Sequence, residues 1–135
     1  MLFRSWAEVD LDALRQNLAW IRHNVGHSVK VITVVKADAY GHGLKPIART
    51  LMQSGTDVFG VANLAEADAI RSVGRGWPVL MLGPGLPHEI NVVVREGVMP
   101  TISSLAEAQL FAAAAAKLRK TVSAHLKIDT GMGRK

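Results

Sequence analysis

The sequence contains no cysteine, and aromatic residues make up only 5% of its 135 positions. The lack of cysteine excludes a disulfide-bonded scaffold, a thiolate nucleophile and a zinc or iron–sulfur site with cysteine ligands. So few aromatic side chains offer no platform for stacking single-stranded nucleic acid. The longest apolar stretches, such as residues 31–35, are far shorter than the ~20 residues of a membrane-spanning helix. Residues 1–14 also lack a signal-peptide pattern, so we expect a cytoplasmic protein without a membrane partner.

The charge balance is basic, with 16 Lys and Arg against 11 Asp and Glu, but the basic residues are scattered. The densest cluster, Lys117, Arg119 and Lys120, ends a predicted helix, where cations are expected in any case. We therefore expect no nucleic-acid partner. The length is that of one domain, and an apolar content of 49% predicts a folded chain rather than a disordered one.

Apolar spacing and turn residues divide the chain into alternating helices and strands. Asp10 precedes an amphipathic run that ends near Gly26, which predicts a helix over residues 11–24 with Asp10 as its N-cap. Residues 29–35 are β-branched and almost continuously apolar, which is typical of a strand buried on both faces. The alternation continues with strands at 58–61, 79–82, 98–102 and 122–128, helices at 44–54, 64–73, 87–96 and 104–119, and a loop at 39–43. This order predicts βαβ units and a parallel sheet.

The number of these units indicates the fold class. After the last predicted strand only residues 129–135 remain, without a further helix. A complete (β/α)8 barrel takes roughly 250 residues. We therefore expect an α/β fold that is a partial barrel of the TIM type, with about five strand–helix units and an open strand edge on each side.

Lys36 is the first candidate for chemistry, because working residues of parallel α/β folds lie at the C-terminal ends of strands. It directly follows the apolar run 31–35. Burial there would favour the neutral amine, a nucleophile that condenses with carbonyl groups, including that of pyridoxal phosphate. Position alone favours a different interpretation, in which the side chain extends to solvent.

The residues around Lys36 resemble a known family in three segments. Residues 34–43 (VVKADAYGHG) are similar to the pyridoxal-phosphate lysine motif of alanine racemases. Residues 6–14 (WAEVDLDAL) resemble the N-terminal opening of that family, and residues 125–134 (HLKIDTGMGR) resemble the loop after its fifth barrel strand. The three matches are in order and correctly spaced, and they cover nearly the whole chain.

The resemblance implies a fold, a cofactor and an activity. Residues 1–135 would be the N-terminal part of the pyridoxal-phosphate barrel domain of a homodimer, and residues 1–10 would include a strand that packs with a C-terminal β domain. Alanine racemases interconvert L-alanine and D-alanine by two-base proton transfer and thereby supply D-alanine for cell-wall synthesis. By this resemblance Lys36 would hold pyridoxal 5'-phosphate as a Schiff base and act as the base for D-alanine.

Other site residues follow from the same resemblance. Tyr40 would reach the cofactor phosphate through its hydroxyl, and Arg134 would contact the cofactor ring oxygen near the substrate carboxylate. Lys127 matches a lysine that some family members carry as a carbamate, which orients that arginine. Without the family, Tyr40 is an amphipathic loop aromatic, and Lys127 and Arg134 are a solvated basic loop. No metal site is expected.

The chain also departs from the family. The second catalytic base of these enzymes is a tyrosine on the C-terminal domain, whereas Tyr40 is the only tyrosine here. We therefore expect little or no racemase activity from these 135 residues alone. Two alternatives stay open: a single-domain pyridoxal-phosphate carrier or homeostasis protein, and an inactive, truncated α/β module.

Overall fold

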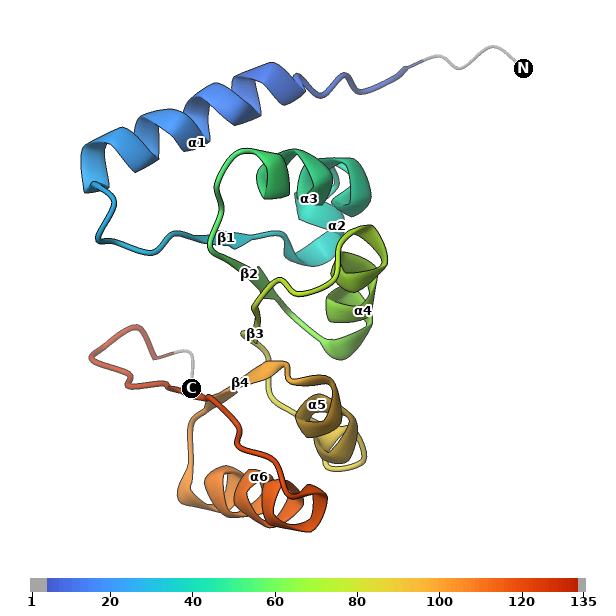
Figure 1. Ribbon diagram of the computed structural model, residues 1–135, viewed down its shortest axis with the longest axis vertical. Coiled ribbons are helices and arrows are strands. Elements are labelled where there is room, and N and C mark those ends of the chain that lie inside the picture. Colours follow the sequence, from blue (N-terminus) through green and yellow to red (C-terminus); the bar gives the residue numbers. More distant parts are fainter. Residues whose placement is uncertain (1–4, 134–135) are drawn as a thin grey trace.

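The computed structural model describes residues 5–133, in which strands and helices alternate along the chain (Figure 1). Residues 5–10 form neither helix nor strand. The elements, in chain order, are α1 (Leu11–Val25), β1 (Ile32–Val34), α2 (Lys36–Tyr40), α3 (Leu44–Gln53), β2 (Val58–Val61), α4 (Leu64–Val73), β3 (Val79–Met81), α5 (Ile90–Glu96), β4 (Met99–Ile102), α6 (Leu105–Leu118) and β5 (His125–Leu126).

Within this part of the chain the five strands form one sheet in the order β1-β2-β3-β4-β5, and every neighbouring pair is parallel. The predicted α/β fold with about five strand–helix units is therefore confirmed. Helix α1 packs on α3, α3 on α4 and α5 on α6, so the helices follow the curved sheet along its outer side (Figure 1). The helices therefore cover one face of the sheet.

The core lies between the sheet and these helices. Phe59, Val61, Val79 and Met81 are fully buried on the helix-covered face. On the other face the ladder places Val34 beside Gly60, and a Cβ on Gly60 would lie only 3.1 Å from Cγ2 of Val34. This inner face is close-packed at the middle strands.

The inner face is open at β1. Ile32 and Val34 are 39% and 37% exposed, so the prediction of a strand buried on both faces is wrong for this one. β1 is an edge strand, and only its helix-facing side is covered. The apolar run that precedes Lys36 thus forms an edge strand of the sheet and not a central strand.

Helix starts agree with their capping residues. Asp10 accepts hydrogen bonds from the N–H groups of Asp12 and Ala13, as its predicted N-cap role requires. Residues 63–67 (NLAEA) and 104–108 (SLAEA) begin α4 and α6 with the same pattern, in which an Asn or Ser cap is followed three residues later by Glu. These are capping boxes, and they explain why both helices begin within a residue of the predicted position.

Some predicted bounds differ from the structure. The strands predicted at 29–35 and 122–128 are shorter, because pairing is limited to the residues that face a neighbouring strand. The helix expected from 87 begins at Ile90. The loop expected at 39–43 is partly replaced by α2, whose backbone is described below. No helix within residues 5–133 is both long and apolar enough to cross a membrane.

Candidate active site

Lys36 lies directly after β1, at the C-terminal end of the sheet, and begins the turn labelled α2. The next four residues, Ala37 to Tyr40, all have φ between 52° and 57°, so α2 is a left-handed turn. For residues other than glycine this conformation costs about 1–2 kcal/mol each. Such strain persists where the surroundings hold it, and it clusters at functional sites. The strained backbone therefore indicates that the segment after Lys36 is a candidate functional site.

Hydrogen bonds within the loop close this turn. The Ala39 N–H donates to the Val35 carbonyl at 2.9 Å, and the Gly41 N–H donates to the Ala37 carbonyl at 3.0 Å. His42 donates through Nδ1 to the Ala39 carbonyl at 2.8 Å, which gives this histidine a structural role. Gly41 continues the positive φ, at 84°, without the cost that a side chain would carry.

Two carboxylates attach the turn to its neighbouring helices. Asp38 accepts the N–H of Leu44, the first residue of α3, at 2.7 Å. Glu66, in the first turn of α4, accepts the N–H of Ala37 at 2.7 Å and, through its other oxygen, the N–H of Ala62 at 2.7 Å. The turn is therefore held by α3, the next helix along the chain, and by α4, whose Glu66 lies 29 residues from Ala37 in the sequence.

The side chains of the turn are available to a ligand. Lys36 is half-buried, and Tyr40 is 59% exposed. Within residues 5–133 we find no hydrogen bond or ion pair to the Lys36 amine or the Tyr40 hydroxyl. An amine and a phenol without partners, four residues apart on one turn, can bind a carbonyl group and an anionic group of the same molecule.

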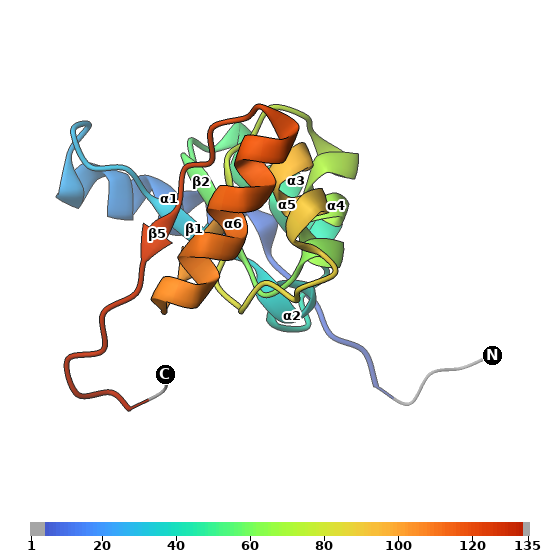
Figure 2. The same cartoon turned by 90° about the horizontal axis from the view of Figure 1, so that it is seen from below.

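Lys127 lies at the opposite edge of the sheet. Its N–H donates to the Ile102 carbonyl at 2.8 Å, which extends the pairing of β5 with β4, and its side chain is half-buried. The loop that follows is shaped by Asp129, whose Oδ1 accepts the N–H groups of Gly131 and Gly133. Figure 2 shows α2 and this loop at the same end of the sheet. Arg134 lies outside the described residues.

The structure therefore places Lys36 and Tyr40 on one turn, and Lys127 at the same end of the sheet but at its far edge. Glu66 was not among the residues singled out from the sequence. In the sequence, Glu66 is recognisable only as part of the capping box after strand 58–61. That pattern predicts a helix start but does not predict the contact with Ala37.

A cleft of about 630 Å³ is a separate feature. It lies between α1, β1 and α3, and its lining is mainly apolar. Tyr40 and His42 are among its lining residues, but Lys36 is not. Of the two candidate residues on the turn, Tyr40 therefore borders this cleft and Lys36 does not.

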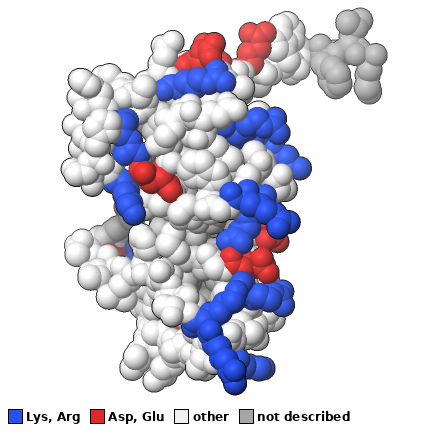
Figure 3. Space-filling model, viewed as in Figure 1, with Lys and Arg blue, Asp and Glu red and all other residues white. Residues whose placement is uncertain are grey.

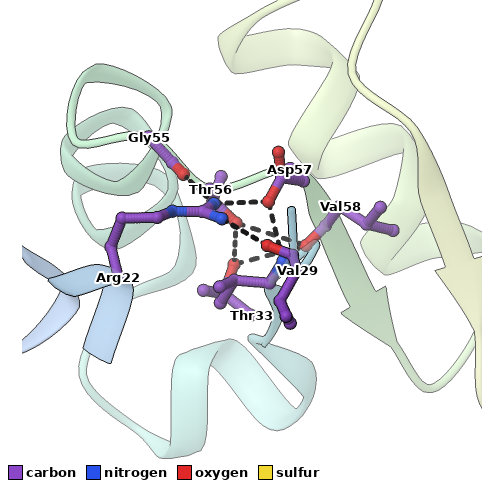
Figure 4. Close-up of polar contacts among 8 residues, drawn as sticks. Arg22, Val29, Thr33, Gly55, Thr56, Asp57 and Val58 are labelled. Carbon is purple, nitrogen blue, oxygen red and sulfur yellow. Dashed lines mark hydrogen bonds and ion pairs between the residues drawn. The ribbon is translucent and has the colours of Figure 1, made fainter. Parts of the chain in front are cut away.

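At the other end of β1, Arg22 joins α1 to the sheet (Figure 4). Its guanidinium donates to the carbonyls of Val29 and Gly55, at 2.6 and 2.7 Å, and pairs with the carboxylate of Asp57. The hydrogen bond from Arg22, and next that from the Val31 N–H, hold the pKa of Asp57 below its ordinary value. This cluster stabilises the start of the strand that ends at Lys36.

The surface charge does not form a patch of one sign on the face in Figure 3. Lys and Arg side chains gather along the side where α3, α4 and α5 lie, but Asp and Glu side chains interrupt them there. This distribution agrees with the scatter of basic residues in the sequence.

Comparison with known proteins shows which proteins this chain resembles. A family model described as "Alanine racemase, N-terminal domain" matches residues 9–135. The chain is 45% identical over 131 residues to a protein named alanine racemase from Methylacidiphilum infernorum (isolate V4), a match that covers 97% of this chain and 34% of that protein. An alanine racemase from Synechocystis sp. is 42% identical over 132 residues, which are 97% of this chain and 36% of that protein. The chain thus spans about a third of the length of these curated relatives.

Solved structures show the same fold. An alanine racemase from Clostridium difficile 630 superposes with a TM-score of 0.90 at 35% identity, over 99% of this chain and 35% of that one. The alanine racemase from Bartonella henselae, with covalently bound pyridoxal phosphate, gives a TM-score of 0.85 at 27% identity, over 93% and 37% of the two chains. A histidine racemase from Leuconostoc mesenteroides gives 0.81 at 30% identity, over 92% and 33%. The predicted partial barrel is thereby confirmed.

Proposed function

The chain belongs to the alanine racemase family, and on that premise we propose that it forms the cofactor-lysine side of a pyridoxal-phosphate-dependent alanine racemase. A relative with covalently bound pyridoxal phosphate supports the cofactor. The proposal extends to the whole protein's cytoplasmic location, its homodimeric assembly and its supply of D-alanine for the cell wall. The family name of the relatives supports the substrate.

The residues on the turn fit this cofactor. Pyridoxal phosphate has one aldehyde and one phosphate, and α2 presents one amine, which has no partner among residues 5–133, and one exposed phenol. When bound, the cofactor supplies an electron sink for the charge left when an amino acid loses its α-proton. The half-buried Lys36 suits covalent attachment, because its primary amine can condense with an aldehyde.

Each proposed residue then has a separate task. Lys36 holds the cofactor and, when its Nζ is free, takes and returns the α-proton on one face of the substrate. The Tyr40 hydroxyl would hold the cofactor phosphate by donating a hydrogen bond. Arg134, through its permanently charged fork, orients the cofactor ring and the substrate carboxylate. Lys127, as a carbamate, orients Arg134. A second base, from another part of the homodimer, serves the opposite face.

One observation carries this proposal more than any other. Lys36 stands between a parallel strand and a left-handed turn of four residues, three of them with no intrinsic preference for that conformation. A sequence maintains such a costly backbone where the geometry of the adjacent side chain matters. Here that side chain is the one amine that resembles a cofactor lysine.

The proposal predicts selective modification of Lys36. We expect pyridoxal phosphate added to the purified chain to give a visible absorbance, and borohydride reduction followed by peptide mapping to locate the label on Lys36. The Lys36→Ala variant should lose the label. The Lys45→Ala variant is the matched control, since Lys45 is exposed on nearby α3, and it should keep it. Equal labelling of exposed lysines, unchanged by Lys36→Ala, would contradict the assignment.

Racemisation assays then test the substrate. In a protein that includes this chain and the second base, we expect turnover of alanine and loss of turnover in Lys36→Ala. Histidine is the comparison substrate, because one similar structure is a histidine racemase. Preference for histidine would leave the role of Lys36 intact but reject the substrate proposed here.

A further inference from the structure

We propose that Glu66 is a positioning residue for Lys36, a role that rests on the proposed function of Lys36 and adds a residue to it. The carboxylate of Glu66 accepts the Ala37 N–H on Oε1 and the Ala62 N–H on Oε2, both at 2.7 Å. It thereby joins the segments that follow two neighbouring strands, β1 and β2.

The bond to Ala37 acts on Lys36 through the peptide unit. The N–H that Glu66 accepts belongs to the same planar peptide as the carbonyl of Lys36. Holding this plane holds ψ of Lys36, and with it the direction in which the side chain leaves the strand end. Glu66 therefore does not need to touch the amine to orient it.

The strain in α2 explains why the hydrogen bond from Ala37 to Glu66 is needed. Ala37, with φ of 52°, is the first left-handed residue of the turn. An alanine there has an accessible lower-energy conformation, so contacts outside the turn must hold it. A hydrogen bond to a charged acceptor is among the stronger contacts available.

Helix capping does not account for both bonds. In the equivalent box at α6, Oε2 of Glu107 accepts the N–H and the hydroxyl of Ser103, the residue before the cap. The equivalent bond of Glu66 is that from Ala62. The bond from Ala37 is additional, since it comes from a loop 29 residues away in the sequence.

The Glu66→Gln variant separates these roles. Its amide nitrogen cannot accept a hydrogen bond, so the side chain can serve Ala37 or Ala62 but not both. We expect hydrogen exchange at the Ala37 amide to become about tenfold faster, the equivalent of one lost charge-assisted bond. We also expect attachment of pyridoxal phosphate to Lys36, followed by absorbance, to become several-fold slower.

Asn63→Ala is the matched control. Asn63 caps α4 by accepting the Glu66 N–H at 3.0 Å, so its loss weakens the same helix end while the carboxylate of Glu66 remains. We expect this variant to lose a comparable amount of stability and to keep the wild-type exchange rate at Ala37 and the wild-type attachment rate. Glu66→Asp, which keeps the charge but is one methylene shorter, should behave like Glu66→Gln and replaces it if that variant does not fold.

Each outcome of these measurements either supports or rejects the positioning role of Glu66. Faster exchange and slower attachment in Glu66→Gln, but not in Asn63→Ala, support the positioning role. Unchanged exchange at Ala37 in both Glu66→Gln and Glu66→Asp, or unchanged attachment despite faster exchange, overturns it. If the wild-type chain does not take pyridoxal phosphate at Lys36, the proposed function fails and the positioning role fails with it, whereas normal wild-type attachment with no effect of Glu66→Gln rejects the positioning role alone.

Discussion

Single carboxylates hold the loops of this chain by accepting backbone N–H groups. Asp10 caps α1, Asp38 binds the start of α3, and Glu66 joins the segments after β1 and β2. Asp57 does the same for Val31 while it pairs with Arg22. Acidic residues that a sequence reader could take for general acids are therefore engaged in structure.

The pair of Arg22 and Asp57 predicts a pH dependence of stability. Because its pKa is lowered in the folded chain, ionised Asp57 stabilises the fold at pH values above its ordinary pKa, and this contribution disappears as the pH falls through the lower, folded value. We expect the urea midpoint of the wild type to fall more steeply between about pH 5 and 3 than that of Asp57→Asn. Parallel curves for the two proteins would show that the pair does not contribute.

Among the elements, α2 is the one that departs from ordinary preference. Its hydrogen bonds follow the i to i−4 pattern of a helix, but its residues are left-handed. Local propensity would make a right-handed turn from Ala37, Asp38 and Ala39. The conformation observed is imposed by α3 and α4 through Asp38 and Glu66.

This conformation predicts opposite effects for the same substitution at two sites. Ala37→Gly removes about 1–2 kcal/mol of strain and loses about 0.4–1 kcal/mol through the freer unfolded chain, so we expect a gain of roughly 0.5–1 kcal/mol. Ala65→Gly, at an exposed position in right-handed α4, should cost about 0.5–1 kcal/mol. Chemical denaturation measures both. Destabilisation of similar size at the two sites would mean that α2 carries no strain.

For the molecule as a whole, the arrangement of strands leaves two edges, β1 and β5, within the part of the chain described here. Leu126 on β5 and Ile128 just after it are 73% and 72% exposed, and the inner face is open at Ile32 and Val34. Unpaired edges with apolar side chains are sites of association with other chains. Lys36 follows the edge strand β1, and Lys127 follows the edge strand β5.

We therefore expect the 135-residue chain to self-associate as its concentration rises. The double variant Leu126→Lys, Ile128→Lys should shift light-scattering masses toward the monomer, because charges at an edge oppose strand pairing. Leu110→Lys is the control, since Leu110 is 50% exposed but lies on the helix α6 and not on an edge strand. A wild type that stays monomeric at every concentration would refute this expectation.

The pattern of strands and helices could be predicted because its signals are local. Capping residues such as Asp10 and the two capping boxes favour a helix start through contacts with the next few residues. Short β-branched runs between the helices favour strands. Strand ends were less predictable. Pairing decides where a strand stops, and the neighbours of β1 and β5 are distant in the sequence.

The features of the candidate site are likewise of two kinds, those that the sequence predicts and those that it does not. The sequence alone determined that Lys36 and Tyr40 follow a parallel strand, since motif and strand are contiguous. Only the tertiary structure decided that the turn between them is left-handed, that β1 is open on its inner face, and that Glu66 holds the peptide after Lys36. The reason is physical: these features depend on packing and on a hydrogen bond between Ala37 and Glu66, 29 residues apart in the sequence, which no local preference encodes.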